Sequence, residues 1–266
     1  MYVNPASVTM SSGEFYDTEG ADYYLSPAKL ESDYASVRFE RELRLFRRFC
    51  GSGSVLDVGC GSGAFLFQLK TRWPGDYEIL GTDVSGAPLN YAESRGLPVL
   101  RGNLLEHAFA GKRFDAITLW AVLEHLNEPD KFLIKVQEIL KPGGLCFALV
   151  PNARSLATRL LGIRYRYIYS QHLNYFTAQT LRMLVAARFE VIELRTTHFN
   201  PIVIWQDFRS GGREASNAER ADLLKRTTAY KQSAALKPVK ALYRLTEQGL
   251  DALGLADNLA VVLRRR

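Results

Sequence analysis

Apolar residues along the first part of the chain follow two alternating patterns. Short, nearly continuous apolar runs typical of strands cover residues 54–58, 77–84, 98–100, 114–123 and 145–150. Apolar residues at helical spacing lie between these runs, at residues 64–70, 89–95 and 131–140. Apolar strands that alternate with helices indicate a parallel sheet with helices on both faces. The pattern therefore predicts an α/β fold.

The pattern becomes less regular beyond Pro151. Residues 177–188 combine an N-terminal Thr with helical spacing, and residues 189–196 alternate like a strand. Residues 200–257 have a mostly helical pattern, and residues 259–263 form a final β-branched run. Because a strand follows it, the helical stretch is predicted to be an insertion before the last strand.

A glycine-rich segment, VLDVGCGSG at residues 55–63, joins a predicted strand to a predicted helix. Glycines let the backbone turn tightly and approach a ligand, and the N-terminus of the next helix offers free N–H groups. The spacing of Gly59, Gly61 and Ala64 also fits a dinucleotide-binding fingerprint. Asp83 downstream fits that fingerprint as a ribose ligand. The glycines alone therefore leave the class of cofactor open.

Asp57 favours one of these cofactor classes. It lies at the end of the predicted strand, at the mouth of the glycine loop. A carboxylate at this place repels a pyrophosphate and attracts an ammonium group. S-adenosylmethionine carries an ammonium group on its methionine end, together with a ribose that Asp83 would bind. The pair of acids therefore favours S-adenosylmethionine over a nicotinamide nucleotide.

Three motifs, in this order along the chain, resemble those of class I S-adenosylmethionine-dependent methyltransferases. They are VLDVGCGSG at residues 55–63, FDAITLWAVLEHL at 114–126 and LKPGG at 140–144. The resemblance is closest to the branch of ubiquinone-type and sugar-tailoring O-methyltransferases, in which a stretch such as QHLNYFT at residues 171–177 recurs. It implies a Rossmann-like, seven-stranded, mostly parallel sheet with helices on both faces. The last strand is then antiparallel, with a helical insertion before it.

The resemblance also implies which residues bind the cofactor. Asp57 and the glycines would hold the methionine part, and Asp83 the ribose hydroxyls. Val84 and Asn103 would lie against the adenine. The complete set expected at the cofactor is Arg38, Asp57, Gly59, Cys60, Gly61, Gly63, Asp83, Val84, Asn103, Leu104, Trp120 and Ala121.

Two histidines are the candidate catalytic residues. His125 follows the buried strand near the expected sulfonium end of the cofactor, and His172 lies in an aromatic-rich segment expected over the acceptor. Either imidazole could take a proton from an acceptor hydroxyl. In the ubiquinone-type enzymes an acid three residues before the Glu-His pair helps to form a proposed metal site. Ala121 stands at this place here, so no metal site is expected.

The net charge of +6 is unevenly distributed. Residues 1–152 carry 15 Lys and Arg against 19 Asp and Glu, whereas residues 153–266 carry 19 against 9. The basic half predicts an acidic acceptor and contact with an anionic membrane surface, with a solvated basic face as the alternative. Residues 234–253 have the pattern of a basic amphipathic helix, which either lies on a membrane or packs as a lid.

Composition predicts a soluble, cytoplasmic protein. An apolar share of 47% is enough for a large core, and no apolar run approaches the roughly 18 residues of a membrane helix. Residues 1–20 lack the basic and apolar regions of a signal peptide. Three scattered cysteines are too few for a disulfide framework or a zinc site.

The predicted organisation has four parts: an N-terminal segment at residues 1–34, a cofactor-binding core at 35–199, a helical cap at 200–257 and a final core strand at 258–266. The predicted function is O-methylation of a small molecule, such as a sugar, a polysaccharide precursor or a lipid-linked acceptor. An RNA or protein methyltransferase and a cofactor-binding protein without transfer activity stay open as alternatives. No DNA partner is expected, and the oligomeric state is left open.

Overall fold

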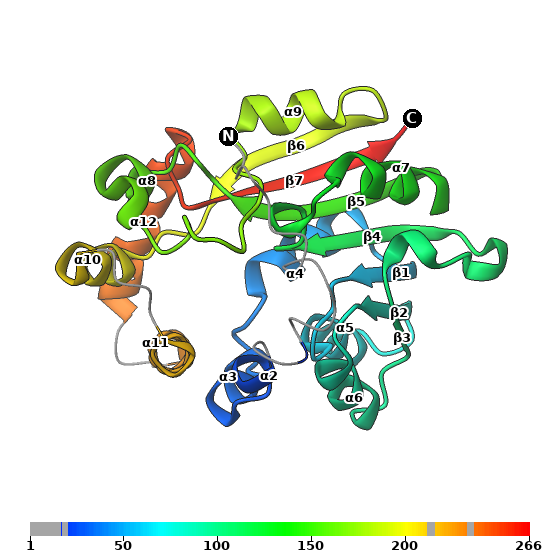
Figure 1. Cartoon of the computed structure of the whole chain (residues 1–266), viewed down its shortest axis with the longest axis horizontal. Helices are drawn as coiled ribbons and strands as arrows, with labels where there is room; N and C mark the ends of the chain where they lie inside the picture. Colours follow the sequence, from blue (N-terminus) through cyan, green and yellow to red (C-terminus); the bar gives the residue numbers. More distant parts are fainter. Residues whose placement is uncertain (1–16, 18–20, 212–215, 233–236) are drawn as a thin grey trace.

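The computed structural model of the chain describes residues 17, 21–211, 216–232 and 237–266. Its centre is a seven-stranded sheet with the strand order β3-β2-β1-β4-β5-β7-β6 (Figure 1). The strands are β1 (Gly53–Val58), β2 (Tyr77–Asp83), β3 (Val99–Arg101), β4 (Phe114–Trp120), β5 (Leu140–Pro151), β6 (Phe189–Thr197) and β7 (Asn258–Arg265). Strands β1 to β5 pair in parallel, and β7 is antiparallel to both β5 and β6. The predicted fold class is confirmed, including the antiparallel last strand.

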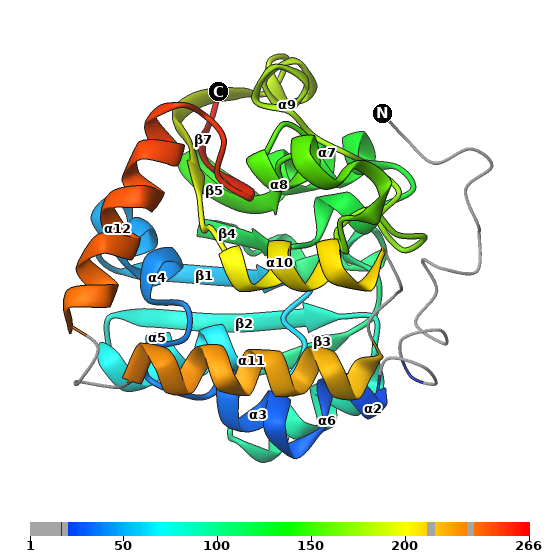
Figure 2. The same ribbon diagram turned by 90° about the vertical axis from the view of Figure 1, so that its left-hand side faces the viewer.

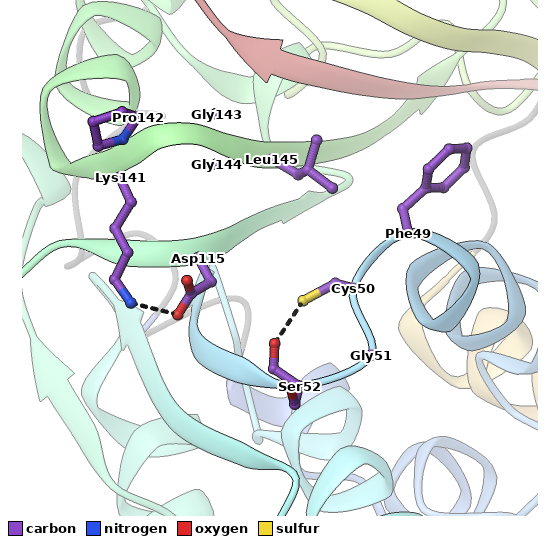
Figure 3. A pocket seen from close by; sticks show the side chains of 10 residues that line it. All are labelled: Phe49, Cys50, Gly51, Ser52, Asp115, Lys141, Pro142, Gly143, Gly144 and Leu145. Atoms are coloured by element: carbon purple, nitrogen blue, oxygen red, sulfur yellow. Dashed lines mark hydrogen bonds and ion pairs between the residues drawn. The ribbon is translucent and has the colours of Figure 1, made fainter.

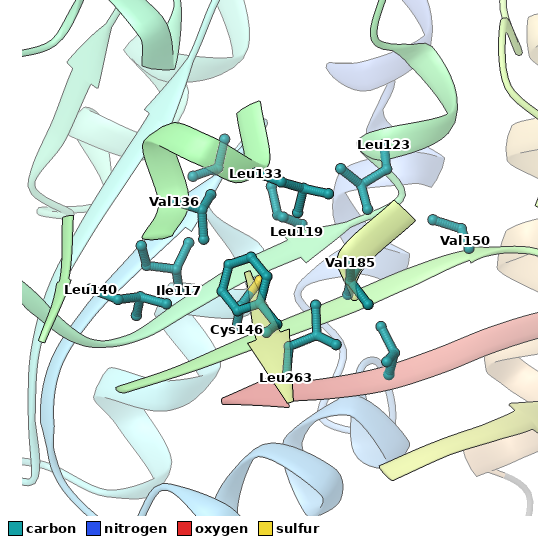
Figure 4. Packing of buried hydrophobic residues seen from close by; sticks show 14 of the residues in the cluster. Ile117, Leu119, Leu123, Leu133, Val136, Leu140, Cys146, Val150, Val185 and Leu263 are labelled. Atoms are coloured by element: carbon teal, nitrogen blue, oxygen red, sulfur yellow. The ribbon is translucent and has the colours of Figure 1, made fainter. Parts of the chain in front are cut away.

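Each face of the sheet carries its own apolar core, because neighbouring residues of a strand point to opposite faces. Leu56 packs with residues of α7 (Pro129–Ile139) and α9 (Ala178–Val185), in the cluster drawn in Figure 4. Val55 packs on the other face with residues of α4 (Glu40–Phe49) and α5 (Ala64–Arg72). The sheet is therefore the middle layer of three, as the continuous apolar strands predict.

The chain order reverses between β1 and β4. After β1 the chain adds β2 and β3 on one side, and then returns to place β4 and β5 on the other. In open α/β sheets, ligands bind at the carboxyl ends of the strands at such a point. The candidate residues at the ends of β1, β2 and β4 therefore lie at the edge of the sheet where a ligand is expected.

Three helices lie between β6 and β7 along the chain: α10 (Pro201–Ser210), α11 (Asn217–Gln232) and α12 (Lys237–Ala252). Helix α11 lies alongside α3 (Pro27–Asp33) and also contacts α2 (Ala21–Tyr24) (Figure 2). The insertion and the N-terminal helices, which are far apart in sequence, therefore pack against each other. Within the described ranges, no helix is long and apolar enough to cross a membrane.

Two strand boundaries differ from the predicted ones by three residues or more. The strand predicted at residues 114–123 ends at Trp120, because Ala121 adopts a left-handed φ of 58°. The chain then makes the short 3-10 helix η5 (Leu123–His125). The strand predicted at residues 145–150 begins earlier, at Leu140, with a register shift against β4. The early end of β4 brings η5 to the carboxyl edge of the sheet.

Candidate active site

The glycine loop connects β1 to α5 at the carboxyl edge of the sheet. Gly59, Gly61 and Gly63 have positive φ angles of 69°, 52° and 77°. A Cβ atom at Gly59 would lie 2.7 Å from Val122, and one at Gly63 would lie 2.4 Å from Leu97. Both positions therefore favour glycine, because glycine adopts a positive φ without strain and has no Cβ atom to collide with these side chains. Because Gly63 is the N-cap of α5, no side chain caps that helix, and its first N–H groups remain available to a ligand.

Two carboxylates, the buried Asp57 and the partly buried Asp83, lie beside the glycine loop. Asp57, at the end of β1, accepts a hydrogen bond from the Thr118 hydroxyl at 2.6 Å. Burial raises the pKa of Asp57 to about 7, and the nearby charge of Asp83 adds to this effect. Asp83 accepts the N–H of Gly61 at 2.8 Å, and burial raises its pKa too. A ligand with an ammonium group and hydroxyl groups would offset the cost of burying both acids.

The residues predicted at the adenine lie next to Asp83. Val84 follows β2 directly, and Asn103 precedes the 3-10 helix η3 (Leu104–Glu106). The side-chain oxygen of Asn103 accepts the Leu105 N–H at 3.0 Å. A hydrogen bond to an adenine amino group would therefore use the second lone pair of that oxygen. Leu104 is buried and forms the apolar side of this corner.

Asp17 is a residue of this corner that sequence reasoning missed. Its carboxylate accepts hydrogen bonds from the Ser85 hydroxyl at 2.8 Å and from the N–H groups of Gly86 and Ala87 at 2.6 Å and 3.2 Å. These are the first N–H groups of α6 (Gly86–Ser94), so Asp17 caps that helix. No motif marks Asp17, because its contact with α6 joins residues about 70 positions apart in the sequence.

Arg38, predicted to bind the carboxylate of the cofactor, is paired inside the protein. Its Nε lies 3.2 Å from Asp33 Oδ1, and its guanidinium lies 4.7 Å from the ring centre of Phe39. Asp33 also pairs with Lys29. The neighbouring Tyr34 donates its hydroxyl to the Ser62 carbonyl at 2.5 Å. The N-terminal helices therefore touch the glycine loop through Tyr34, while Arg38 is held by Asp33.

Trp120, Ala121 and Cys60 complete the predicted cofactor set. Trp120 packs against Phe65, with ring centres 5.3 Å apart, and its buried Nε1–H has no hydrogen-bond partner among the described residues. The left-handed Ala121 follows it at the end of β4. Cys60 packs closely on β2, where a Cβ atom at Gly81 would lie 2.6 Å from its sulfur. Cys60 therefore holds the loop against β2.

The structure brings the two predicted catalytic histidines together. The rings of His125 and His172 have centres 4.7 Å apart. Burial lowers the pKa of His125 to about 4 and that of His172 to about 3. Glu124 lies in the same cluster, and burial raises its pKa to about 8. Glu124 is part of a predicted motif, but the sequence assigned it no role.

Aromatic rings and one arginine surround this cluster. The ring centres of Tyr167, Tyr169 and Tyr175 lie 6.3 Å, 4.4 Å and 6.4 Å from that of His172. Arg220 of α11 lies near both histidines, where its charge further lowers their pKa values. The helical insertion therefore places a cation near the histidine cluster.

Three other basic residues of the insertion that the structure describes have partners or surroundings of their own. Lys225 pairs with Glu31 at 2.9 Å, and Arg226 pairs with Asp222 at 2.9 Å. Arg209 is exposed and lies 4.8 Å from the ring centre of Trp205. Arg213 lies outside the described residues.

A surface hollow elsewhere contains the third predicted motif (Figure 3). Its lining includes Ser52, Asp115 and Lys141, and Asp115 pairs with Lys141 at 2.7 Å. These residues lie at the amino ends of β1, β4 and β5, opposite the glycine loop. Since ligands bind at the carboxyl ends in such sheets, the LKPGG motif at residues 140–144, with which β5 begins, lies away from the edge where a ligand is expected.

Comparison with known proteins agrees with this geometry. A family model described as a methyltransferase domain matches residues 33–194. A ubiquinone biosynthesis O-methyltransferase of Cereibacter sphaeroides is 34% identical over 152 residues, which cover 53% of this chain and 59% of that relative. The chain thus matches less than two thirds of this relative's length.

Solved structures share the fold at low identity. A SAM dependent methyltransferase from Archaeoglobus fulgidus has a TM-score of 0.58 and 18% identity, with 92% of this chain and 98% of that chain covered. Phosphoethanolamine N-methyltransferase 2 of Haemonchus contortus, in complex with S-adenosyl-L-methionine, has a TM-score of 0.58 and 16% identity, with 95% and 59% covered. The predicted resemblance is confirmed, and the chain belongs to the methyltransferase domain family.

Proposed function

We propose that this protein is an S-adenosylmethionine-dependent methyltransferase. The observation that carries the proposal is the pair of acids beside the glycine loop, one buried and one partly buried. Asp57 and Asp83 both have raised pKa values, and neither forms an ion pair with a described residue. The ammonium group of S-adenosylmethionine would give Asp57 a positively charged partner, and its ribose hydroxyls would donate hydrogen bonds to Asp83.

Each part of the cofactor has a proposed set of residues. Asp57 and the loop at Gly59, Gly61 and Gly63 hold the methionine part, and Asp83 binds the ribose. Val84, Asn103 and Leu104 contact the adenine, while Cys60, Trp120 and Ala121 shape the pocket between them. Arg38 contacts the cofactor carboxylate with its terminal nitrogens, because its Nε faces Asp33. When bound, the cofactor supplies an activated methyl group, so these residues catalyse by positioning it.

We infer that the acceptor is a small molecule methylated on oxygen. Relatives over the matched region are named ubiquinone biosynthesis O-methyltransferases, which supports a lipid-linked acceptor. His125 and His172 face the acceptor and remain unprotonated, so that each offers a ring nitrogen to an acceptor hydroxyl. Arg220 beside them favours an acceptor that carries a carboxylate, a phosphate or an acidic hydroxyl.

Membrane contact through the basic C-terminal half is part of the proposal. Five large apolar side chains are exposed on α8 (Leu156–Leu161), the 3-10 helix η6 (Gly162–Arg164) and α10, which we call the α8–α10 surface: Leu160, Ile163, Ile202, Trp205 and Phe208. Exposed Arg159, Arg164 and Arg209 lie among them along the chain. Apolar and aromatic side chains beside arginines are typical of peripheral contact with anionic lipid.

Cofactor binding tests the proposal directly. Calorimetry should detect binding of S-adenosylmethionine and no comparable binding of NAD. Asp83→Ala should weaken S-adenosylmethionine binding by about 1–3 kcal/mol, since the ribose hydroxyls lose their acceptor. Tight NAD binding without S-adenosylmethionine binding would refute the proposal. Labelled methyl transfer to sugar nucleotides, polyprenylated phenols and RNA would then identify the acceptor class.

A further inference from the structure

Tyr34 holds the glycine loop from the side of the N-terminal helices. It is the C-cap of α3, and its hydroxyl donates a hydrogen bond of 2.5 Å to the Ser62 carbonyl oxygen. The N–H at the other end of the same peptide unit belongs to Gly63 and donates to the Cys60 carbonyl at 2.9 Å. Both ends of this peptide are therefore fixed. The peptide leads directly into the first turn of α5, whose N–H groups remain available to a ligand.

The ring of Tyr34 is held by residues of α5 and α6. Its centre lies 4.9 Å from that of Phe67 and 5.7 Å from that of Tyr91. The guanidinium of Arg95 lies 5.2 Å from the centre of the Tyr34 ring. Burial raises the pKa of the Tyr34 hydroxyl, which therefore keeps the proton that it donates. Because packing already orients the ring, little side-chain entropy is lost when the hydrogen bond to the loop forms.

The two residues after Tyr34 are also tied to α5. Gln68 donates a hydrogen bond from its side-chain amide to the Ala35 carbonyl at 2.8 Å, and Arg72 donates to the Ser36 carbonyl. Gln68 is buried, and its side-chain oxygen accepts the Nε–H of Arg72 at 2.8 Å. The C-terminal end of α3 is therefore fastened to the loop and the helix that form the cofactor site.

Helix α3 also contacts the insertion. Helix α11 lies alongside it (Figure 2), and Lys225 of α11 pairs with Glu31 of α3 at 2.9 Å. On the acceptor side, Leu223 of α11 packs against the apolar cluster that contains Tyr165. Arg220 of the same helix is near enough to His125 and His172 to lower their pKa values. A continuous chain of contacts therefore runs from the glycine loop through α3 and α11 to the acceptor side.

We propose that Tyr34 is a positioning residue that couples the cofactor site to the acceptor side. When its hydroxyl holds the Ser62 carbonyl, the glycine loop has the shape that binds the methionine part of the cofactor, and α3 is docked where it supports α11. Coupling between two parts of a protein is reciprocal. A cofactor that favours the held loop must therefore also favour the docked positions of α3 and α11. This inference rests on the proposed binding of S-adenosylmethionine.

The coupling gives the two ligands a preferred order of binding. With S-adenosylmethionine bound, α3 and α11 stay docked, and Arg220 is held beside the two histidines. Without it, α3 and α11 undock more often, and the acceptor side is complete for a smaller fraction of the time. An acceptor therefore binds more tightly to protein that already carries the methyl donor.

Amide hydrogen exchange of the full-length protein tests the coupling without any acceptor. Exchange is measured by mass spectrometry with and without saturating S-adenosylmethionine. In the wild type, the cofactor should slow exchange in α3 and α11 about threefold to tenfold, because it makes their undocking rarer. Helix α9, which packs on the opposite face of the sheet from α4 and α5, is the internal reference and should change little.

Tyr34→Phe removes the hydroxyl and keeps the ring. By calorimetry, this variant should bind S-adenosylmethionine about threefold to tenfold more weakly, and the cofactor should no longer slow exchange in α11. Tyr77→Phe is the matched control, because the Tyr77 hydroxyl also donates to a backbone carbonyl, that of Cys50 at 2.7 Å, but at the amino end of β2. It should keep both the wild-type affinity and the effect on α11.

Three results would overturn the coupling. The first is α11 exchange in the wild type that S-adenosylmethionine does not change, and the second is a folded Tyr34→Phe variant with wild-type affinity. The third is an equal loss of affinity in Tyr34→Phe and Tyr77→Phe, which would show a general effect on stability. These three results leave the proposed function intact. If S-adenosylmethionine did not bind to the wild type at all, the proposed function would fail, and the coupling with it.

Discussion

The guanidinium of Arg220 lies 4.6 Å from the ring centre of Tyr23. This contact joins α11 of the insertion to α2 at the other end of the chain. Arg220 also lies 5.9 Å from the ring centre of Tyr169, beside the histidine cluster. A single arginine thus links the N-terminal helices, the insertion and the acceptor side of the site.

Arg220→Ala should impair the acceptor and spare the cofactor. The variant removes a cation of the insertion whose charge acts on both histidines. A hydrogen bond to a charged group contributes about 1.5–3 kcal/mol, so KM for an acidic acceptor should rise at least about tenfold. The dissociation constant of S-adenosylmethionine should change little.

Arg226→Ala is the matched control for this experiment, because Arg226 is exposed and pairs with Asp222 on its own helix. It should leave KM unchanged. A comparable rise of KM in both variants would mean that the net charge of the insertion, rather than the position of Arg220, acts on the acceptor.

The binding of S-adenosylmethionine should depend on pH through Asp57. Burial raises the pKa of this carboxyl to about 7, so the carboxyl is largely protonated below pH 7 in the free protein. The ammonium group of the cofactor needs the carboxylate form. Affinity measured by calorimetry should therefore fall by up to about tenfold for each pH unit below 7.

Asp57→Asn is the control for this pH dependence. The amide keeps the shape and cannot ionise, so this variant should bind weakly with a nearly flat profile between pH 5.5 and pH 7. A profile equally steep in the variant would assign the titration to another group.

The part of the site that follows local sequence rules was predictable. Glycines with positive φ at Gly59, Gly61 and Gly63 follow from the need for a tight turn between a strand and a helix. Asp57 and Asp83 follow from their places at strand ends, since parallel strands bring their carboxyl ends to one edge. The seven-stranded, mostly parallel sheet with an antiparallel last strand follows from the family resemblance.

The remaining parts of the site could not be predicted, because they depend on contacts between residues that are far apart in the sequence. His172 reaches Glu124 and His125 only because the loop before α9 folds back on η5 through backbone hydrogen bonds. The Asp17 carboxylate caps α6 from about 70 positions earlier in the sequence, and no motif marks this contact either. The LKPGG motif contributed only to the family resemblance, and the fold places it at the amino ends of the strands, away from the glycine loop.

The α8–α10 surface should bind anionic lipid vesicles. Ile163 is 86% exposed and Trp205 is 58% exposed, so an aspartate at either position should not disturb the core. Ile163→Asp and Trp205→Asp should each reduce co-sedimentation with phosphatidylglycerol-containing vesicles several-fold, because a charge would have to enter the apolar part of the bilayer.

Met183→Asp provides the comparison for the vesicle experiment, because Met183 is 70% exposed on α9. It should leave co-sedimentation unchanged. If Leu245→Asp on α12 reduced binding and the two α8–α10 variants did not, the amphipathic helix predicted at residues 234–253 would be the membrane-binding element.

Glu42 should make folding stability depend on pH in the acid range. Burial alone raises the pKa of Glu42, but His198, 3.2 Å away, and the charge of Arg38 together lower it to about 2. The pKa of the Glu42 carboxyl is therefore lower in the folded state than in the unfolded state. The stabilisation is fully present above about pH 4.5 and is lost as the pH falls towards 2.

Glu42→Gln should thus lower the free energy of unfolding at pH 7 by on the order of 2 kcal/mol. The difference from the wild type should shrink steadily between pH 4.5 and pH 3, because the wild type loses the same ionised contact by protonation. Urea unfolding followed by circular dichroism at several pH values measures both quantities. A difference that stayed constant down to pH 3 would show that packing around the side chain, and not its charge, stabilises the fold here.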